Sequence, residues 1–322
     1  MNTNENVKRK FEYKELLSKL GPLLALIVLI IFVSVLSPSF LSLTNLMNLM
    51  RQVSTNALIA FGMTFVIITC GIDLSVGSTL ALSSALSSAI MAGMIVNGID
   101  PLIAMTVSLI AGFVLGAVNG LLITKGKLVP FIATLATMTI YRGTTLVLTE
   151  GKPITGLDET FIFQFMGRGY FFGIPFPIVN TLVVFALLYV LLHKMSFGRK
   201  MFTIGGNEKA SFIAGVKSNK IKIFVYSISG VLASLAGIIL TSRLNSAQPT
   251  AGESYEMDAI ASVVLGGTSM SGGKGRIFGT LIGALIIGTL NNGLNLLGVS
   301  TFYQQIVKGI VIIIAVLIDR RK

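Results

Sequence analysis

The sequence predicts an all-α fold: a polytopic membrane helix bundle of about ten transmembrane helices, with both termini in the cytoplasm. Of the 322 residues, 53% are hydrophobic and 12% are charged, and the mean hydropathy is +0.85. This composition leaves too little polar surface to cover a soluble globule. Apolar runs near the ~20 residues that cross a bilayer recur along the chain, and Lys and Arg gather in alternate connections.

The first apolar run, 21–37, follows a basic segment and has no small-residue cleavage pattern. We therefore interpret it as a transmembrane helix and not as a removed signal peptide. A single transmembrane domain, 21–319, then lies between a cytoplasmic N-terminal tail, 1–20, and a cytoplasmic C-terminal tail, 320–322. The further spans are expected at 52–71, 75–96, 101–123, 128–149, 177–193, 222–242, 257–270, 277–297 and 303–318, of which 257–270 is the weakest.

The basic residues support this orientation. With the N-terminus inside, 19 of the 25 Lys and Arg residues fall on inner connections and their edges, five fall on outer ones, and Lys308 falls within the last span. Membrane topology therefore accounts for the formal charge of +12, and no nucleic acid partner is expected. The outer half of the bundle receives seven acids: Asp100, Glu150, Asp158, Glu159, Glu253, Glu256 and Asp258.

Few residues in the chain could perform chemistry. No cluster of His, Cys and carboxylates suits a metal, and no Ser/His/Asp set shares one expected helix face. The stretch "LGGTSMSGGKGR", 265–276, differs at two positions from the phosphate-binding loop motif and follows no strand. We therefore expect no catalytic residue, no metal and no cofactor. The one cysteine, Cys70, stands in an apolar run and is expected to be a small buried side chain.

Asp73, in the stretch "TCGIDLSVGS", is the only charged residue between Arg51 and Asp100. It follows the second span and precedes the third by two residues. A carboxylate there would accept free N–H groups of the third helix and place a negative charge at its positive end. We therefore interpret Asp73 as a helix cap, with Ser75 and Gly77 as its structural neighbours. A proton relay, or a ligand for a substrate or ion, is the alternative.

The inner connection 194–221 is too long for a plain turn and carries six basic residues. Its middle, "NEKASFIAGV", predicts a short helix that Asn207 caps and that ends at Gly215. Ala210, Phe212 and their neighbours give this helix an apolar face in the cytoplasm, which favours a protein partner. An ordinary basic cytoplasmic loop is the alternative.

Glycines recur four residues apart in two of the expected spans. This spacing lets helix backbones approach closely in lipid, so we interpret it as a packing feature of a compact bundle. The residues are Gly112, Gly116 and Gly120 in one span, and Gly279 and Gly283 in the other.

Several strings together resemble one known family. They are "GIDLSVGS", "FIATLAT", "GGNEKAS", "YSISGVLASLAGII", "RLNSAQPTAG" and the long run that begins "DAIASVVLGGTSMSGGKGRIFGTLIG". Over about residues 20–320 they resemble the permease subunit of bacterial ATP-binding-cassette importers for simple sugars, and most closely the ribose branch of that family. The resemblance implies that the chain translocates a simple sugar, D-ribose first of all, across the cytoplasmic (inner) membrane of a bacterium.

The resemblance also implies partners. They are a second copy of the permease in a homodimer, an ATPase subunit with two nucleotide-binding modules, and an extracytoplasmic sugar-binding protein, with membrane lipid around the bundle. ATP hydrolysis would occur on the ATPase subunit, so the chain itself is not expected to be an enzyme.

The resemblance assigns the coupling to the ATPase to the short helix of the inner connection. One departure concerns its spacing, because Gly follows Glu by six residues in the general importer pattern, whereas Gly215 follows Glu208 by seven. This difference puts a contact-by-contact transfer from other importer classes in doubt. The residues assigned to coupling are Asn207, Glu208, Ala210, Ser211, Ala214 and Gly215.

Two further interpretations stay open. Polar side chains on small-residue helices could line a translocation path, or they could hydrogen-bond one helix to another. These side chains are Asn56, Asn291, Asn292 and Asn295. An ion-coupled sugar symporter and a channel-like protein without energy coupling are the alternative functions. A symporter usually places ionisable groups near the middle of the bilayer, and only Asp73 and Lys308 are candidates.

Overall fold

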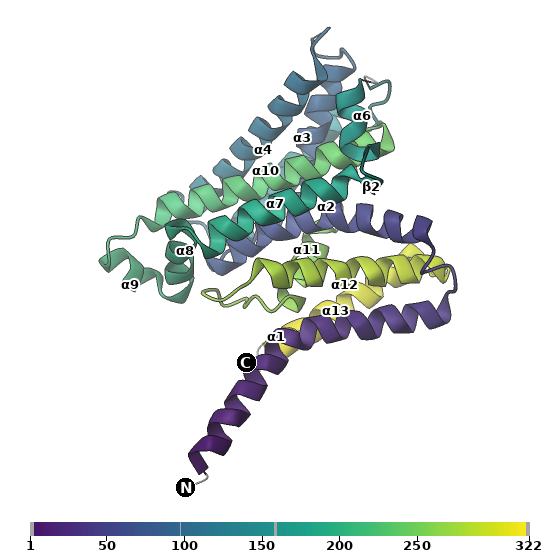
Figure 1. Ribbon diagram of the computed structural model, residues 1–322. Helices are drawn as coiled ribbons and strands as arrows, with labels where there is room; N and C mark the ends of the chain where they lie inside the picture. The colour runs from purple at the N-terminus through teal and green to yellow at the C-terminus, as the bar shows by residue number, and fades with distance from the viewer. Residues whose placement is uncertain (1–2, 97, 158–159, 320–322) are drawn as a thin grey trace.

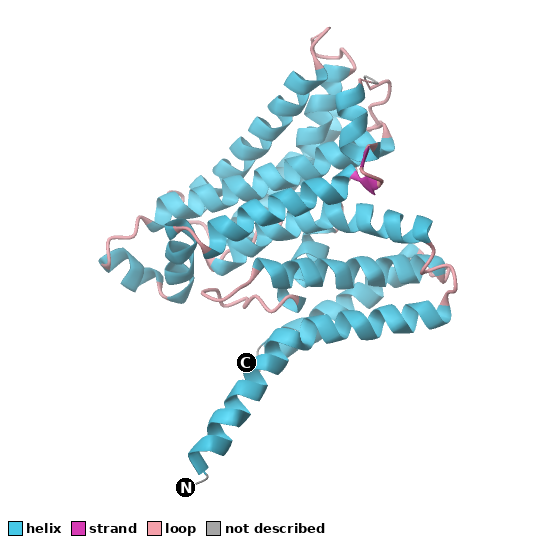
Figure 2. Ribbon diagram, viewed as in Figure 1, coloured by secondary structure: helices cyan, strands magenta, loops and turns pink. Residues whose placement is uncertain are grey.

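The computed structural model describes residues 3–96, 98–157 and 160–319, so the expected C-terminal tail at 320–322 lies outside the described residues. Helices build most of this part of the chain (Figures 1 and 2). Their bounds are α1 Thr3–Leu36, α2 Leu43–Ile68, α3 Val76–Met91, α4 Pro101–Thr124, α5 Pro130–Thr149, α6 Phe161–Arg168, α7 Phe176–His193, α8 Ser196–Gly206, α9 Glu208–Ile213, α10 Ser218–Leu244, α11 Tyr255–Leu265, α12 Ile277–Leu296 and α13 Thr301–Asp319.

Six helices of the described residues are long and apolar enough to cross a membrane: α2, α4, α5, α7, α10 and α12. Three shorter apolar stretches accompany them, namely Leu20–Leu36 within α1, Val76–Met91 and Thr301–Ile314. The polytopic helical membrane fold is therefore confirmed. The number of ten spans and the side on which the termini lie stay predictions.

The structure shows the form of the expected N-terminal tail and shortens one expected span. The expected tail at 1–20 is helical from Thr3 onwards, and Figure 1 shows this part of α1 extending away from the bundle. The expected span 257–270 is only the 11-residue α11, which at 1.5 Å per residue is about 16 Å long, half of the ~30 Å hydrocarbon core. The helix ends there because Gly267 adopts a left-handed backbone conformation with φ +84°.

The long connection between α5 and α7 holds α6 and a short hairpin. Its strands are β1 Tyr170–Phe171 and β2 Ile174–Pro175, which pair antiparallel. Apart from these two-residue strands and one isolated bridge, the described residues that form regular structure are helical, so the all-α fold class holds.

Helix α2 lies at the centre of the bundle, with α10 and α7 on one side and α12 and α1 on the other (Figure 1). Glycines set the closest helix pairs. A Cβ on Gly112 of α4 would meet the carbonyl oxygen of Gly230 of α10, and a Cβ on Gly283 of α12 would meet that of Ser262 of α11. The packing role predicted for both glycine series is therefore confirmed.

Candidate functional site

Asp73 lies between α2 and α3 and is fully enclosed, with 1% of its surface exposed. Its Oδ1 accepts the backbone N–H of Ser75 at 3.1 Å and the Ser75 hydroxyl at 2.7 Å. Its Oδ2 accepts the hydroxyl of Ser229 on α10 at 3.0 Å. Asp73 therefore joins Ser75, the residue before α3, to α10. The N-cap residue of α3 is Ser75 and α3 has no side-chain cap hydrogen bond, so Asp73 does not make the cap contact that the sequence predicted.

The network around Asp73 continues into two more helices. The side-chain amide of Asn119 on α4 donates to the Ser75 hydroxyl at 2.7 Å. The hydroxyl of Thr137 on α5 donates to the side-chain oxygen Oδ1 of Asn119, also at 2.7 Å. Gly77 belongs to the same region, because a Cβ there would meet the carbonyl oxygen of Gly252. The function of Asp73, Ser75 and Gly77 stays a prediction, and their contacts give them a packing role.

Asp258 forms a second buried centre that the sequence did not predict. It was expected at the outer end of the span 257–270, and it lies within α11, where it is 3% exposed. Its Oδ2 accepts the ammonium of Lys308 on α13 at 3.0 Å and the amides of Asn291 and Asn56 at 3.4 and 3.5 Å. The opposite charge of Lys308 and the two amide donors offset the free-energy cost of removing the carboxylate from water.

The asparagines that were candidates for the path mostly connect helices. Asn292 of α12 and Asn45 of α2 exchange two hydrogen bonds of 2.9 Å, and Asn295 accepts the amide of Gln304 at 2.7 Å. Asn56 and Asn291 point to Asp258. The structure thus supplies contacts for the helix-to-helix interpretation, while a place on the translocation path stays a prediction for all four.

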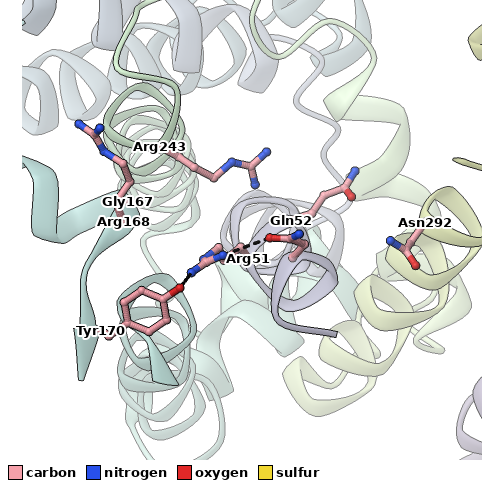
Figure 3. A pocket seen from close by; sticks show the side chains of 8 residues that line it. Arg51, Gln52, Gly167, Arg168, Tyr170, Arg243 and Asn292 are labelled. Carbon is pink, nitrogen blue, oxygen red and sulfur yellow. Dashed lines mark hydrogen bonds between the residues drawn. The ribbon is translucent and has the colours of Figure 1, made fainter. Parts of the chain in front are cut away.

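A polar cavity of about 470 Å³ opens between α2, α6, β1, α10 and α12. Figure 3 shows Arg51, Gln52 and Arg243 around this opening, with Arg51 donating to the hydroxyl of Tyr170. The Arg51 guanidinium also lies 5.1 Å from the centre of the Tyr170 ring and donates to Asn48 at 3.1 Å. We call this hollow the arginine cavity; its described lining residues are Asn48, Arg51, Gln52, Gly167, Arg168, Tyr170, Arg243 and Asn292.

The arginine cavity is rich in hydrogen-bond donors, and none of its described lining residues is acidic. Such a surface suits sugar hydroxyls or acidic side chains. Sequence reasoning missed it because Arg51, Tyr170 and Arg243 lie on three separate segments. The available signal was the small number of outer basic residues, two of which, Arg51 and Arg243, adjoin the expected spans.

The connection between α7 and α10, expected on the inner side, forms two helices, α8 and α9, that meet at Asn207. The predicted cap is confirmed, because the Asn207 side chain accepts the N–H of Ala210 at 3.0 Å. The chain turns away after α9 at Gly215, whose φ is +79°. Glu208 of α9 forms an ion pair of 2.7 Å with Lys222 of α10, so α9 is attached to the first turns of α10.

The apolar side of α9 faces outward. Phe212 and Ile213 are 75% and 86% exposed, whereas Ser211 is buried against the protein. A groove of about 790 Å³ lies beside them. Ala210, Ala214 and Gly215 are exposed as well. The segment is therefore open to a partner, although contact with an ATPase stays a prediction. The described residues that line the groove are Asn207, Glu208, Lys209, Phe212, Ile213, Ser218 and Asn219.

Cys70 differs from its expectation, because it is exposed at the end of the α2 region. Its thiol donates toward the carbonyl oxygens of Ser271 at 3.1 Å and Gly205 at 3.3 Å. Nearby, the N–H of Gly273 donates to the carbonyl oxygen of Ile68 at 3.0 Å. The end of α2, the end of α8 and the loop 266–276 therefore pack together. No group of three or more potential metal ligands occurs among the described residues.

Comparison with known proteins identifies transport permeases as relatives, the class of protein that the sequence resembles. Residues 45–316 match the family model described as branched-chain amino acid transport system / permease component. The chain is 64% identical over 314 residues to the ribose import permease protein RbsC of Bacillus subtilis. This match covers 98% of this chain and 96% of that protein. No solved structure matches the chain.

Two further relatives come from Escherichia coli. Its ribose import permease protein is 54% identical over 275 residues, covering 85% of this chain and 84% of that protein. Its D-allose transport system permease protein is 45% identical over 270 residues, covering 84% and 81%. These relatives and the apolar helices place the chain in the bacterial inner membrane as a multi-pass protein. The chain belongs to the permease family of ATP-binding-cassette importers that includes the ribose import permeases.

Proposed function

We propose that the chain carries D-ribose across the cytoplasmic membrane as the permease subunit of an ATP-binding-cassette importer. The observation that carries this proposal is the 64% identity, across nearly the full length of both chains, to a ribose import permease. D-Allose and L-arabinose permeases are also relatives, at 45% and 37% identity. The larger identity favours ribose as the sugar.

The partners follow from this function. ATP is hydrolysed on a separate ATPase subunit with two nucleotide-binding modules, which contacts α9 and the groove beside it. An extracytoplasmic sugar-binding protein delivers the sugar at the opposite face, where the arginine cavity opens. A second copy of the chain completes a homodimer around the path. The exposed Phe212 and Ile213 support the ATPase contact, because such apolar surface favours burial against a partner.

The proposed topology keeps both termini in the cytoplasm and counts ten passages. In this arrangement α11 and the irregular loop 266–276 together make the eighth passage. Non-helical backbone at membrane depth is tolerated where it is buried in protein. Gly266 and Thr268 are buried, and the N–H of Gly273 donates to the carbonyl oxygen of Ile68, which supports such burial. The excess of basic residues on the proposed inner segments supports the same orientation.

An ion-coupled symporter is the second candidate, and the buried pair Asp258–Lys308 is the observation that favours it. Uptake into vesicles tests both. The permease, the ATPase and the binding protein are reconstituted together, and labelled pentoses and hexoses are offered with ATP inside. We expect ribose uptake that requires ATP and the ATPase and that persists with an uncoupler. Uptake that an uncoupler abolishes while ATP is present would establish the symporter instead.

A further inference from the structure

Another hollow lies where the ends of α7 and α12 meet. Its volume is about 560 Å³. Figure 1 shows these helix ends on the same side of the bundle as α8 and α9, which is the cytoplasmic side in the proposed topology. We call this hollow the α7–α12 groove; its described lining residues are Phe185, Tyr189, His193, Lys194, Arg276 and Phe278. None of these is acidic.

The α7–α12 groove is basic at one end and aromatic along its length. Lys194 is the C-cap residue of α7 and Arg276 is the N-cap residue of α12. Phe185 precedes Lys194 by nine residues, which is about 14 Å along the helix axis. The Phe185 ring lies 6.4 Å from the ring of Phe278 and 6.1 Å from that of Tyr189, so the wall is a continuous aromatic surface.

The position of these groups limits what can occupy the groove. Both α7 and α12 have the length and hydropathy of membrane spans, so a wall that reaches about 14 Å up α7 extends into the hydrocarbon layer. A soluble ATPase does not reach that depth. Phe278 is 57% exposed and Phe185 is partly exposed, so the aromatic wall is open to the bilayer.

The basic end of the groove suits a phosphate. Arg276 and Lys194 both carry positive charge, and neither forms an ion pair with another described residue. Arg276 stands at the N-terminus of α12, where the helix dipole adds positive potential. Basic pockets between transmembrane helices on the cytoplasmic side are suited to anionic lipid head groups.

We propose that the α7–α12 groove binds an anionic phospholipid of the inner leaflet. The head-group phosphate lies between Lys194 and Arg276, and one acyl chain lies along Phe185 and Phe278. The charge at one end and the apolar wall at the other match the two parts of such a lipid. The inference rests on the proposed orientation, which places the ends of α7 and α12 at the cytoplasmic surface.

The test uses the full chain in nanodiscs that contain phosphatidylglycerol and phosphatidylcholine in equal amounts. Native mass spectrometry then counts the lipids that stay bound after release from the disc. We expect retained phosphatidylglycerol to exceed phosphatidylcholine. Lys194→Ala and Arg276→Ala should each lower that preference about fivefold, the factor that one basic residue near an anionic surface contributes. Arg276→Lys should keep it.

Matched controls separate the site from general surface charge. Lys125→Ala and Lys127→Ala remove basic residues at the end of α4, outside the groove, and should leave the preference unchanged. Phe278→Ala should weaken retention of both lipids, and inorganic phosphate should not displace phosphatidylglycerol. Equal retention of the two lipids by the unmodified chain would overturn the proposal, and so would an equal effect of the α4 variants.

Two further results would identify a different occupant. Displacement by inorganic phosphate alone would indicate a simple anion site, and protection of the groove by the ATPase or by a second copy of the chain would indicate a protein contact. Either result overturns the lipid proposal. Sugar uptake is measured separately, so a failure of the lipid site with intact ribose uptake leaves the proposed function standing.

Discussion

The ammonium of Lys308 lies 3.0 Å from Oδ2 of Asp258, and the carboxylate side chain is only 4% exposed. This ion pair ties α13, the last helix, to the half-length α11. Two asparagine amides, from Asn56 and Asn291, also point to the carboxylate at 3.5 and 3.4 Å. Because these amide contacts are long, Lys308 is the main partner of the buried charge.

The first prediction follows from this pair. Lys308→Met should destabilise the protein by roughly 3–5 kcal/mol, because it leaves the Asp258 carboxylate buried without a counter-charge. The double variant Asp258→Asn with Lys308→Met should recover most of that loss, since no uncompensated charge remains. Thermal unfolding of the purified variants measures both. Equal losses in the single and the double variant would show that the pair does not hold α11 to α13.

A second prediction concerns Asp73. Asp73→Asn should retain most transport, because its amide oxygen can accept from Ser75 and its NH₂ can donate to the hydroxyl of Ser229. Asp73→Ala should cost about 1–3 kcal/mol, the usual penalty for buried donors left unpaired. Unfolding and ribose uptake are measured together. Normal assembly of Asp73→Asn with no uptake would indicate a proton relay and contradict the structural role.

Cys70 allows a third prediction, on topology. Cys70 is exposed as a residue, but the partial burial of its sulfur raises the pKa of the thiol. Less thiolate is therefore present at neutral pH than in a free cysteine, and alkylation should be slow and should accelerate as the pH rises. Cys70→Ser should keep transport, because a serine hydroxyl can donate to the same carbonyl oxygens. In that background, single cysteines at the exposed Thr155 and Thr250 should react with an impermeant reagent on intact cells.

The control for this labelling is a single cysteine at Asn207. It should react only after the membrane is opened, because the proposed topology places α9 inside. Labelling of Asn207→Cys on intact cells would refute both the orientation and the coupling role of α9.

A fourth prediction concerns the coupling segment. Ala214→Glu places a large charge beside the exposed Phe212 and Ile213, so it should abolish ATP-driven uptake by overlap with the ATPase and by burial of an unpaired charge. The permease should still fold, because Ala214 is exposed in the structure. Lys217→Ala is the matched control and should have little effect. Co-purification of the ATPase measures the contact directly, and full association with full uptake in Ala214→Glu would place coupling elsewhere.

A fifth prediction concerns the arginine cavity. Arg243→Gln should lower ribose uptake without changing ATPase association, because Arg243 lines the arginine cavity in the last turn of α10, whereas α9 contacts the first turns of that helix. Arg51→Gln should have a similar effect and should also release Tyr170. Arg199→Gln, at a basic residue of α8 outside this cavity, is the control. Uptake unchanged in both cavity variants would remove the cavity from the transport path.

Hydropathy was sufficient to predict the long helices. Each of them satisfies its backbone hydrogen bonds within its own segment, so the local sequence largely specifies it. Hydropathy did not predict the end of α11, which depends on the positive φ of Gly267. It also gave no sign that Asp258, at the outer end of an expected span, is buried, because its partner Lys308 lies 50 residues later in the sequence. Asp73 was conspicuous as an isolated charge, yet its partner Ser229 lies 156 residues away. Such pairings arise from helix packing, which a single sequence does not specify.

The glycine contacts between α4 and α10 have a mechanical consequence. The backbones of Gly112 and Gly230 lie in close contact, and a Cβ on Gly116 would meet the carbonyl oxygen of Tyr226, so no side chain separates the two helices at these positions. Nearby, the side chains of Ser108 and Ser234 hydrogen-bond across the same pair of helices. We therefore expect α4 and α10 to move together as one rigid body. The ion pair between Glu208 and Lys222 attaches α9 to one end of this rigid body. A displacement of α9 would thus reach the outer arginine cavity as a rotation of the whole α4–α10 unit.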